Sequence, residues 1–260
     1  MKDKPVKIEV TDGASIPDSK DKGLLNAWWV SFLGAISIII YLVVTKPDPY
    51  KEILLFVPDG ILVTFQVTIF SIIGALVIGL FTGLGRISKN KIINLIASTY
   101  VEVVRGIPLL VQLFYIYFAL GRVVQVPDMI AAVIAMSVCY GAYMGEVFRA
   151  GIESVDSGQT EAARSLGFDK NQTMFLVILP QALRTILPPV GNEFIALLKD
   201  SSLVSIIAVA DILRRGREFA AESFQYFETY TMIALLYLLI TLILSKGVSH
   251  MEERLTHYDR

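Results

Sequence analysis

The chain has few of the side chains from which catalytic and metal sites are built. Its 260 residues include one cysteine, Cys139, and two histidines, His250 and His257, both near the C-terminus. A single cysteine excludes an intrachain disulfide. One cysteine and two histidines near the C-terminus indicate neither a metal site nor a nucleophile–histidine pair. The pattern G-x-x-x-x-G-K-[ST] is absent, so the chain does not bind ATP through a phosphate loop. We therefore expect no enzyme activity and no cofactor in this chain.

Charge of one sign is also lacking. The net charge is −1, so the sequence has no excess of positive charge for binding nucleic acid. Apolar residues are in excess instead: 54% of the chain is hydrophobic and the mean hydropathy is +0.61. This composition is typical of a membrane protein rather than of a soluble domain.

Six apolar runs approach the length of about 20 residues that a helix needs to cross a bilayer. They are Trp28–Thr45, Gly60–Leu84, Ile107–Leu120, Met129–Phe148, Ile186–Leu213 and Tyr230–Lys246. The third run is short, and the amphipathic stretch Ile92–Val104 precedes and extends it. We expect an all-α integral membrane protein.

The distribution of Lys and Arg predicts the orientation in the membrane. With both termini inside, the inner segments carry 15 Lys and Arg and the outer segments carry 6. Residues 1–27 alternate Lys and Asp with Gly and Pro, which predicts a flexible cytoplasmic segment. Residues 248–260 are expected to form a C-terminal cytoplasmic tail. The run at 28–45 starts late and lacks a small-x-small site, which argues against a cleaved signal peptide.

One polar stretch, Glu153–Pro180, interrupts the apolar pattern and lies on the cytoplasmic side in this orientation. Ser157 to Thr160 carry hydroxyl groups suited to a helix start, and Glu161 complements the dipole of the first turn. Ala162 and Ala163 leave one face of this helix almost flat. Gly167 follows as a left-handed C-terminal cap.

A second short helix, Lys170–Leu179, is predicted after Asp169, which caps it. Pro180 ends or kinks that helix. Its apolar residues Met174, Phe175, Val177 and Ile178 predict a buried side. The loop is then a rigid pair of helices that either packs only on its own bundle or docks another protein.

The loop resembles the EAA loop of permease subunits of bacterial ATP-binding-cassette importers. The family pattern is EAA, three residues, G, nine residues and I-x-L-P. Glu161, Ala162, Ala163, Gly167, Leu179 and Pro180 match it at the right spacing, with Val177 in place of the usual isoleucine. The stretches Tyr100–Phe118 and Asn192–Ser205 resemble the polar amino acid uptake branch of the same family.

This resemblance implies a type I importer-like helical bundle in the bacterial inner membrane, with five core spans in residues 59–247 and an additional N-terminal span at 28–45. It also implies an amino acid as substrate. The expected partners are separate ATPase subunits that hold ATP-Mg and contact the loop, an extracytoplasmic substrate-binding protein, and a second copy of the permease or a sister permease.

Charged residues inside the apolar runs are candidates for the substrate pathway, because such residues need partners or a wet cavity. Lys199 and Asp200 lie near the middle of Ile186–Leu213, and together with Ser201 and Ser202 they predict a break between two half-helices, Ile186–Leu198 and Leu203–Leu213. The full candidate set is Asp200, Lys199, Ser201, Ser202, Glu146, Asn192 and Glu193. The alternative is a structural knot in which Lys199 or Asp200 is neutralised by Glu146, Glu193 or Arg149.

Two further patterns have both a functional and a structural interpretation. Arg105, Gly106 and Pro108 interrupt a helix and predict either a hinge or an interfacial helix that leads into a span. The pattern from Gly79 to Gly83 predicts close helix packing, within the chain or in a dimer. An aromatic run at residues 114–118 is typical of a lipid or interface belt.

Two rival functions remain open at this level. One is an ion-coupled carrier that uses Asp200 and Glu146 as relays. The other is a membrane scaffold whose loop recruits a signalling partner. Only the ATP-driven importer requires a separate ATPase for net uptake.

Overall fold

The computed structural model describes residues 26–124 and 126–256, so the predicted flexible segment at residues 1–27 lies almost wholly outside the described part. The described residues contain helices and no strand, which confirms the all-α prediction. In chain order the elements are α1 (Ala27–Thr45), α2 (Pro47–Phe56), α3 (Asp59–Arg86), α4 (Lys91–Gly106), α5 (Leu109–Val123), α6 (Asp128–Glu153), α7 (Ser157–Ser165), α8 (Lys170–Gln172), η1 (Thr173–Ile178), α9 (Leu179–Asp200), η2 (Ser201–Ile207), α10 (Ile212–Ser223) and α11 (Tyr226–Thr256).

Five helices are long and apolar enough to cross a membrane. They are α1, α3, α6, the continuous helix of residues 170–207, and α11. The helices α4 and α5 are each too short to cross a membrane alone, and they count as a sixth span only when taken together across a bend of 104°. The predicted run Ile107–Leu120 thus corresponds to α5, which is too short to span alone. The pattern of five core spans and one additional N-terminal helix agrees with this arrangement.

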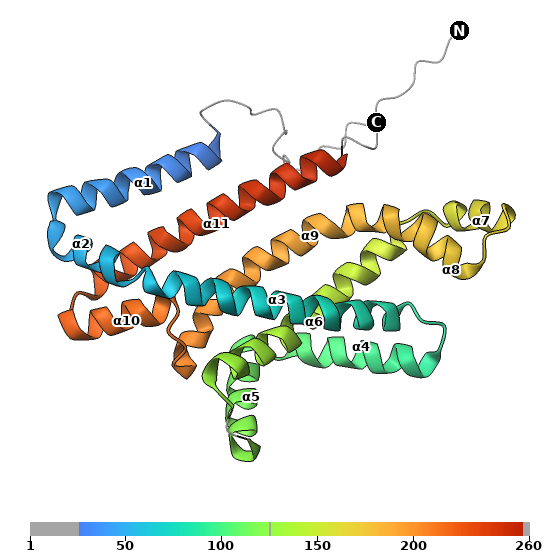
Figure 1. Cartoon of the computed structure of the whole chain (residues 1–260), viewed down its shortest axis with the longest axis horizontal. Helices are drawn as coiled ribbons and strands as arrows, with labels where there is room; N and C mark the ends of the chain where they lie inside the picture. Colours follow the sequence, from blue (N-terminus) through green and yellow to red (C-terminus); the bar gives the residue numbers. More distant parts are fainter. Residues whose placement is uncertain (1–25, 125, 257–260) are drawn as a thin grey trace, which may run out of the picture.

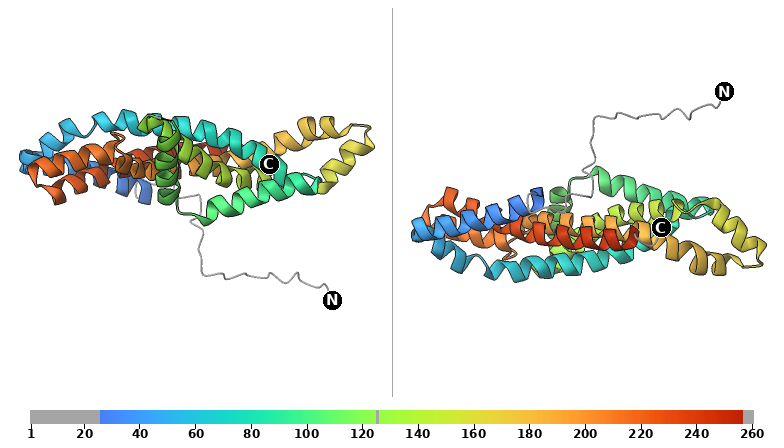
Figure 2. Two further views of the ribbon diagram at one scale, coloured as in Figure 1. Left: turned by 90° about the horizontal axis from the view of Figure 1, so that it is seen from below. Right: turned by 90° about the horizontal axis from the view of Figure 1, so that it is seen from above.

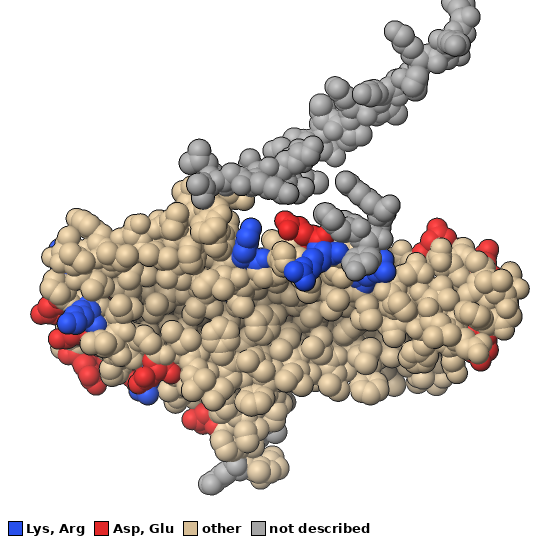
Figure 3. Space-filling model, turned by 45° about the horizontal axis from the view of Figure 1, so that its top comes forward, with Lys and Arg blue, Asp and Glu red and all other residues tan. Residues whose placement is uncertain are grey.

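The long helices lie side by side in an elongated bundle (Figure 1). The segment from α7 to η1 extends beyond the bundle at one end, and α2 and α10 close the opposite end. The views in Figure 2 show that α5 stands across the direction of the other helices. Figure 3 shows a flank that is largely uncharged, with Asp, Glu, Lys and Arg gathered toward the ends and along one edge. This distribution suits a protein whose long flank faces lipid.

Glycines bring α3 and α6 into close contact. A Cβ atom added at Gly79 would lie 2.3 Å from the Cβ of Met144, and one added at Gly145 would lie 2.8 Å from the Cγ2 of Thr82. At Gly83 the nearest atom would be the Cβ of Phe148, at 2.8 Å. Small residues let membrane helices approach in this way. The glycine pattern of α3 therefore serves packing within the chain.

The additional helix α1 packs against the last helix, α11. The indole N–H of Trp28 donates a hydrogen bond of 2.8 Å to the carbonyl of Leu242, and the Nζ of Lys246 lies 5.6 Å from the Trp28 ring. On the other side of α1, Tyr41 and Val44 are 66% and 73% exposed. The helix is thus attached along one side and presents apolar side chains on the other.

A buried carboxyl organises the end of the bundle where α10 begins. Asp211 caps α10, accepting a hydrogen bond of 2.8 Å from the amide of Arg214 and one of 3.3 Å from the hydroxyl of Tyr237. The side chain is fully buried. Burial is the largest influence on this group and raises the pKa of Asp211 to about 6, although the hydrogen bonds that it accepts oppose the shift.

Candidate functional site

The first arm of the protruding loop is the helix α7. Its N-cap is Asp156, whose carboxylate accepts a hydrogen bond of 2.6 Å from the amide of Gly158, so the capping group is a carboxylate and not one of the predicted hydroxyls. The predicted C-terminal cap at Gly167 is confirmed, with φ at +91°. The amide of Gly167 bonds to the carbonyl of Arg164, and the amide of Phe168 bonds to that of Ala163. These two bonds form a Schellman motif, which fixes the turn between the two arms.

The second arm begins as predicted and ends differently. Asp169 and Gln172 form a reciprocal capping box at the start of α8. Pro180 does not end the helix, which was one of the two predicted alternatives, because residues 170–207 run as one helical segment. A π-helical stretch, η1, precedes the proline, and within it the amide of Leu179 bonds to the carbonyl of Met174. This local widening of the helix accommodates a residue that has no N–H to donate.

The tip of the loop presents large apolar side chains. Leu166 is 79% exposed, and Phe175 and Leu176 are each 64% exposed. The predicted buried side is therefore right for Ile178 and wrong for Phe175. Ala163 is buried, whereas Glu161 and Ala162 are exposed. Exposed apolar groups of this size at the end of a polar loop are typical of a surface that another protein covers.

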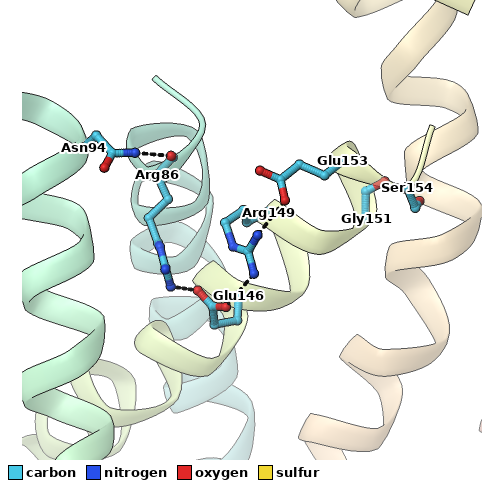
Figure 4. A network of polar contacts seen from close by, with 7 residues as sticks. All are labelled: Arg86, Asn94, Glu146, Arg149, Gly151, Glu153 and Ser154. Atoms are coloured by element: carbon cyan, nitrogen blue, oxygen red, sulfur yellow. Dashed lines mark hydrogen bonds and ion pairs between the residues drawn. The ribbon is translucent and has the colours of Figure 1, made fainter. Parts of the chain in front are cut away.

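A chain of ion pairs lies near the base of the loop (Figure 4). Glu146 on α6 contacts Arg86 on α3 and accepts a hydrogen bond of 3.0 Å from Arg149, which also bonds Glu153 at 2.5 Å. The side-chain amide of Asn94 on α4 donates to the carbonyl of Arg86. Arg86 thus links α3 to α6 through Glu146 and to α4 through Asn94, and Glu146 does not line the same site as Asp200.

A pocket of about 470 Å³ lies between α6, α9 and the bend that joins α4 to α5. We call it the α6–α9 pocket. Its lining residues are Arg105, Gly106, Ile107, Pro108, Leu109, Cys139, Tyr140, Tyr143, Glu193, Ala196 and Asp200. The structure therefore brings the predicted hinge together with two of the predicted pathway carboxylates. In the sequence, the hinge lies about 90 residues before these carboxylates.

Two tyrosines of α6 position the charged groups of the pocket. The hydroxyl of Tyr140 donates a hydrogen bond of 2.8 Å to Oδ2 of Asp200. The guanidinium of Arg105 lies 5.1 Å from the centroid of the Tyr143 ring. Sequence reasoning missed both tyrosines, because the only aromatic residues that it considered were those of the run at residues 114–118. Their spacing of three residues, which places polar tips on one face of an apolar helix, was the available signal.

The remaining predicted pathway residues do not line the pocket. Lys199 and Asn192 are exposed, and Ser201 is buried and donates a hydrogen bond of 2.7 Å to the carbonyl of Leu198. Ser202 is half-buried. The α-helix ends at Asp200, within the predicted break, but the backbone does not open there. The chain continues as the 3₁₀ helix η2 and leaves helical geometry at Ala208, where φ is +70°, so the predicted second half-helix Leu203–Leu213 is wrong.

The bend between α4 and α5 is braced from within the chain. Gly106 is the last residue of α4, and Ile107 is extended, with φ at −108° and ψ at 130°. The side-chain amide of Gln112 donates hydrogen bonds of 2.7 Å and 2.8 Å to the carbonyls of Val104 and Ile107. The bond to Ile107 supplies a partner for a carbonyl just past the end of α4, and the bond to Val104 adds to the 3.4 Å hydrogen bond that this carbonyl accepts from the amide of Ile107.

The sequence matches a known protein family over most of this bundle. The family is described as the binding-protein-dependent transport system inner membrane component, and it matches residues 75–257. The chain belongs to this family. The prediction of a permease subunit is therefore confirmed, and in this family ATP hydrolysis is the task of a separate chain.

Other permeases of this family resemble the chain over most of their length. The glutamine transport system permease of Escherichia coli (strain K12) is 38% identical over 200 residues, covering 76% of this chain and 91% of the relative. The L-cystine transport system permease of Bacillus subtilis (strain 168) is 41% identical over 201 residues, covering 76% and 86%.

Solved structures confirm the permease fold. A crystal structure of an amino acid ABC transporter with histidines matches with a TM-score of 0.73 and 40% identity, covering 86% of this chain and 98% of that one. The inward-facing methionine ABC transporter matches with a TM-score of 0.68, covering 79% and 98% of the two chains, and at 19% identity it shows the fold alone.

Proposed function

We propose that this permease carries an amino acid across the inner membrane and that the α6–α9 pocket holds the substrate during passage. The pocket supports this proposal because it combines a guanidinium with two carboxylates. An amino acid carries an ammonium and a carboxylate on one carbon, so a site for it needs both signs of charge at short range. The relatives named above transport glutamine and cystine, which supports the same substrate class.

The loop from α7 to η1 is the coupling surface in this proposal. An ATPase subunit covers Leu166, Phe175 and Leu176, and Glu161 and Ala162 border the contact. Because the Schellman turn at Gly167 fixes one arm of the loop against the other, movement of the ATPase is transmitted to α9 as a rigid displacement. Since α9 also carries Glu193 and Asp200, a single continuous helix connects the coupling surface to the pocket.

The bend at Arg105, Gly106 and Pro108 is the proposed hinge. It forms one wall of the pocket, so a change in the angle between α4 and α5 opens or closes access to the carboxylates. The loop and both termini lie in the cytoplasm, and a binding protein delivers substrate at the opposite end, near α10. A second permease copy or a sister permease completes the complex.

The coupling proposal is tested by Leu166→Ser. Leu166 is 79% exposed, so the change removes little packing within the chain and should leave the melting temperature within about 1–2 °C of wild type. ATPase co-purification and ATP-driven uptake in reconstituted vesicles should both fall by about tenfold, because the ATPase loses a buried apolar contact. Leu55→Ser, at a site 73% exposed at the other end of the bundle, is the matched control for ATPase co-purification.

Each outcome separates the importer from its rivals. Uptake that needs no ATPase identifies an ion-coupled carrier. If the loop binds a protein other than an ATPase and no substrate is transported, the chain is a scaffold. If Leu166→Ser and Leu55→Ser retain equal ATPase binding and equal uptake, the loop tip is not the coupling surface.

A further inference from the structure

The charges that line the α6–α9 pocket do not balance. The lining contains one cationic side chain, Arg105, and two carboxylates, Glu193 and Asp200. Lys199 neighbours Asp200 in the sequence but is exposed and does not line the pocket. An unbalanced charge within a membrane-spanning bundle is costly unless a partner or a ligand neutralises it.

Within the described residues, none of the three charged groups forms an ion pair. Asp200 is held by the neutral hydroxyl of Tyr140, and Arg105 lies over the ring of Tyr143. Glu193 makes neither a hydrogen bond nor an ion pair among the residues that the structure describes. This differs from Glu146, which is neutralised by two arginines. The pocket therefore keeps three charged groups available to a ligand.

Their positions along α9 suit a ligand with two cationic groups. Glu193 and Asp200 are seven residues apart, which places them on one face of the helix with a rise of about 10 Å between them. Because α6 and α9 both meet the loop at the same end of the bundle, they run antiparallel (Figure 1). Tyr143 and Arg105 thus lie toward Glu193, and Tyr140 holds Asp200 at the other end.

We infer that the substrate of this permease is an amino acid with a positively charged side chain. This inference rests on the proposed function of the α6–α9 pocket. Arg105 takes the α-carboxylate, and the two carboxylates of α9 take the α-ammonium and the side-chain cation. A neutral amino acid leaves one carboxylate without a partner, and an acidic one adds a further negative charge. Only a substrate of net charge +1 neutralises the lining.

Equilibrium binding to the full-length chain in lipid nanodiscs tests this inference. The probes are L-arginine and L-citrulline, which have nearly the same shape but differ in side-chain charge, and L-glutamate. Arginine should bind about tenfold more tightly than citrulline, the ratio expected for one charge-assisted contact, and glutamate should bind more weakly still.

Two variants locate the source of the selectivity. Glu193→Gln and Asp200→Asn each bring the lining to net zero, so each should reduce the preference for arginine over citrulline to about threefold or less. Glu222→Gln removes an exposed carboxylate on α10, outside the pocket, and should keep the preference of wild type. The use of two variants keeps the test valid if one of them does not give a monodisperse protein.

The possible failures are distinct. If wild type binds arginine and citrulline equally well, and binds both at or below about 1 mM, the cationic substrate is refuted. The proposal that the permease transports an amino acid is not affected by that result. Unchanged selectivity in both variants also refutes it, because recognition then lies outside the pocket. Binding of none of the three amino acids at about 1 mM contradicts the proposed function of the pocket itself.

Discussion

The close contact between α3 and α6 gives a quantitative prediction for Gly79→Ala. The added Cβ would lie 2.3 Å from the Cβ of Met144, and 2.9 Å and 3.0 Å from backbone atoms of Met144 and Gly145. Carbon atoms pack best at about 3.5–4.0 Å, so the two helices must separate locally by about 1 Å. Because two of the nearest atoms belong to the backbone, rotation of one side chain does not relieve the overlap.

Overpacking of this kind costs about 1–3 kcal/mol, and the better helix propensity of alanine offsets about 1 kcal/mol of it. A net loss of up to about 2 kcal/mol lowers the melting temperature by up to about 8 °C in a chain of this size. Gly83→Ala, where the nearest contact is 2.8 Å, should lower it less. Gly247→Ala on α11 meets nothing within 4 Å and should leave it unchanged or raise it.

The assay is thermal unfolding of the full-length chain in detergent, followed by fluorescence-detected size exclusion. The order of melting temperatures should be Gly247→Ala first, Gly83→Ala next and Gly79→Ala last. If Gly79→Ala melts together with Gly247→Ala, the helices are not held at the distance that the structure shows, and the glycine pattern has no role in packing within the chain.

Two further predictions concern the remaining contacts of the bundle. Burial raises the pKa of Asp211 to about 6 from a usual 3.8, so the folded state binds this proton more tightly than the unfolded state does. The free energy of unfolding therefore falls as pH rises from about 4 to about 6. Asp211→Asn keeps a capping oxygen and should raise the melting temperature at pH 7.5 while flattening its pH dependence in that window; an unchanged pH profile would show that another group titrates. Trp28→Phe removes the hydrogen bond to the carbonyl of Leu242 and should increase proteolysis between α1 and α2 while uptake persists, whereas a loss of uptake would give α1 a part in transport.

Local backbone structure could be predicted from the sequence wherever a short stretch of residues determines it. The cap at Gly167 and the cap at Asp169 follow from neighbouring residues, since each satisfies amides or carbonyls within the same turn. The apolar runs also predicted α3 and α6 closely, because crossing a bilayer imposes a length on any helix. The predicted end of the last span at Lys246 was wrong, since α11 continues through most of the predicted tail to Thr256. The helix does not end at Pro180, because a π-helical turn, which no propensity of single residues predicts, precedes the proline and lets the helix continue.

The pairing of distant residues was decided only by the tertiary structure. The sequence proposed Glu146 and Asp200 as members of one pathway, but Glu146 lies with Arg86 near the loop and Asp200 lies with Tyr140 in the pocket. Arg105 reaches the same pocket from the bend after α4. Which charges meet depends on how the helices are rotated and shifted against each other, and the glycine contacts of α3 with α6 set that register. The sequence by itself thus determined a membrane bundle with a capped polar loop, while packing between helices determined which of its charges line the α6–α9 pocket.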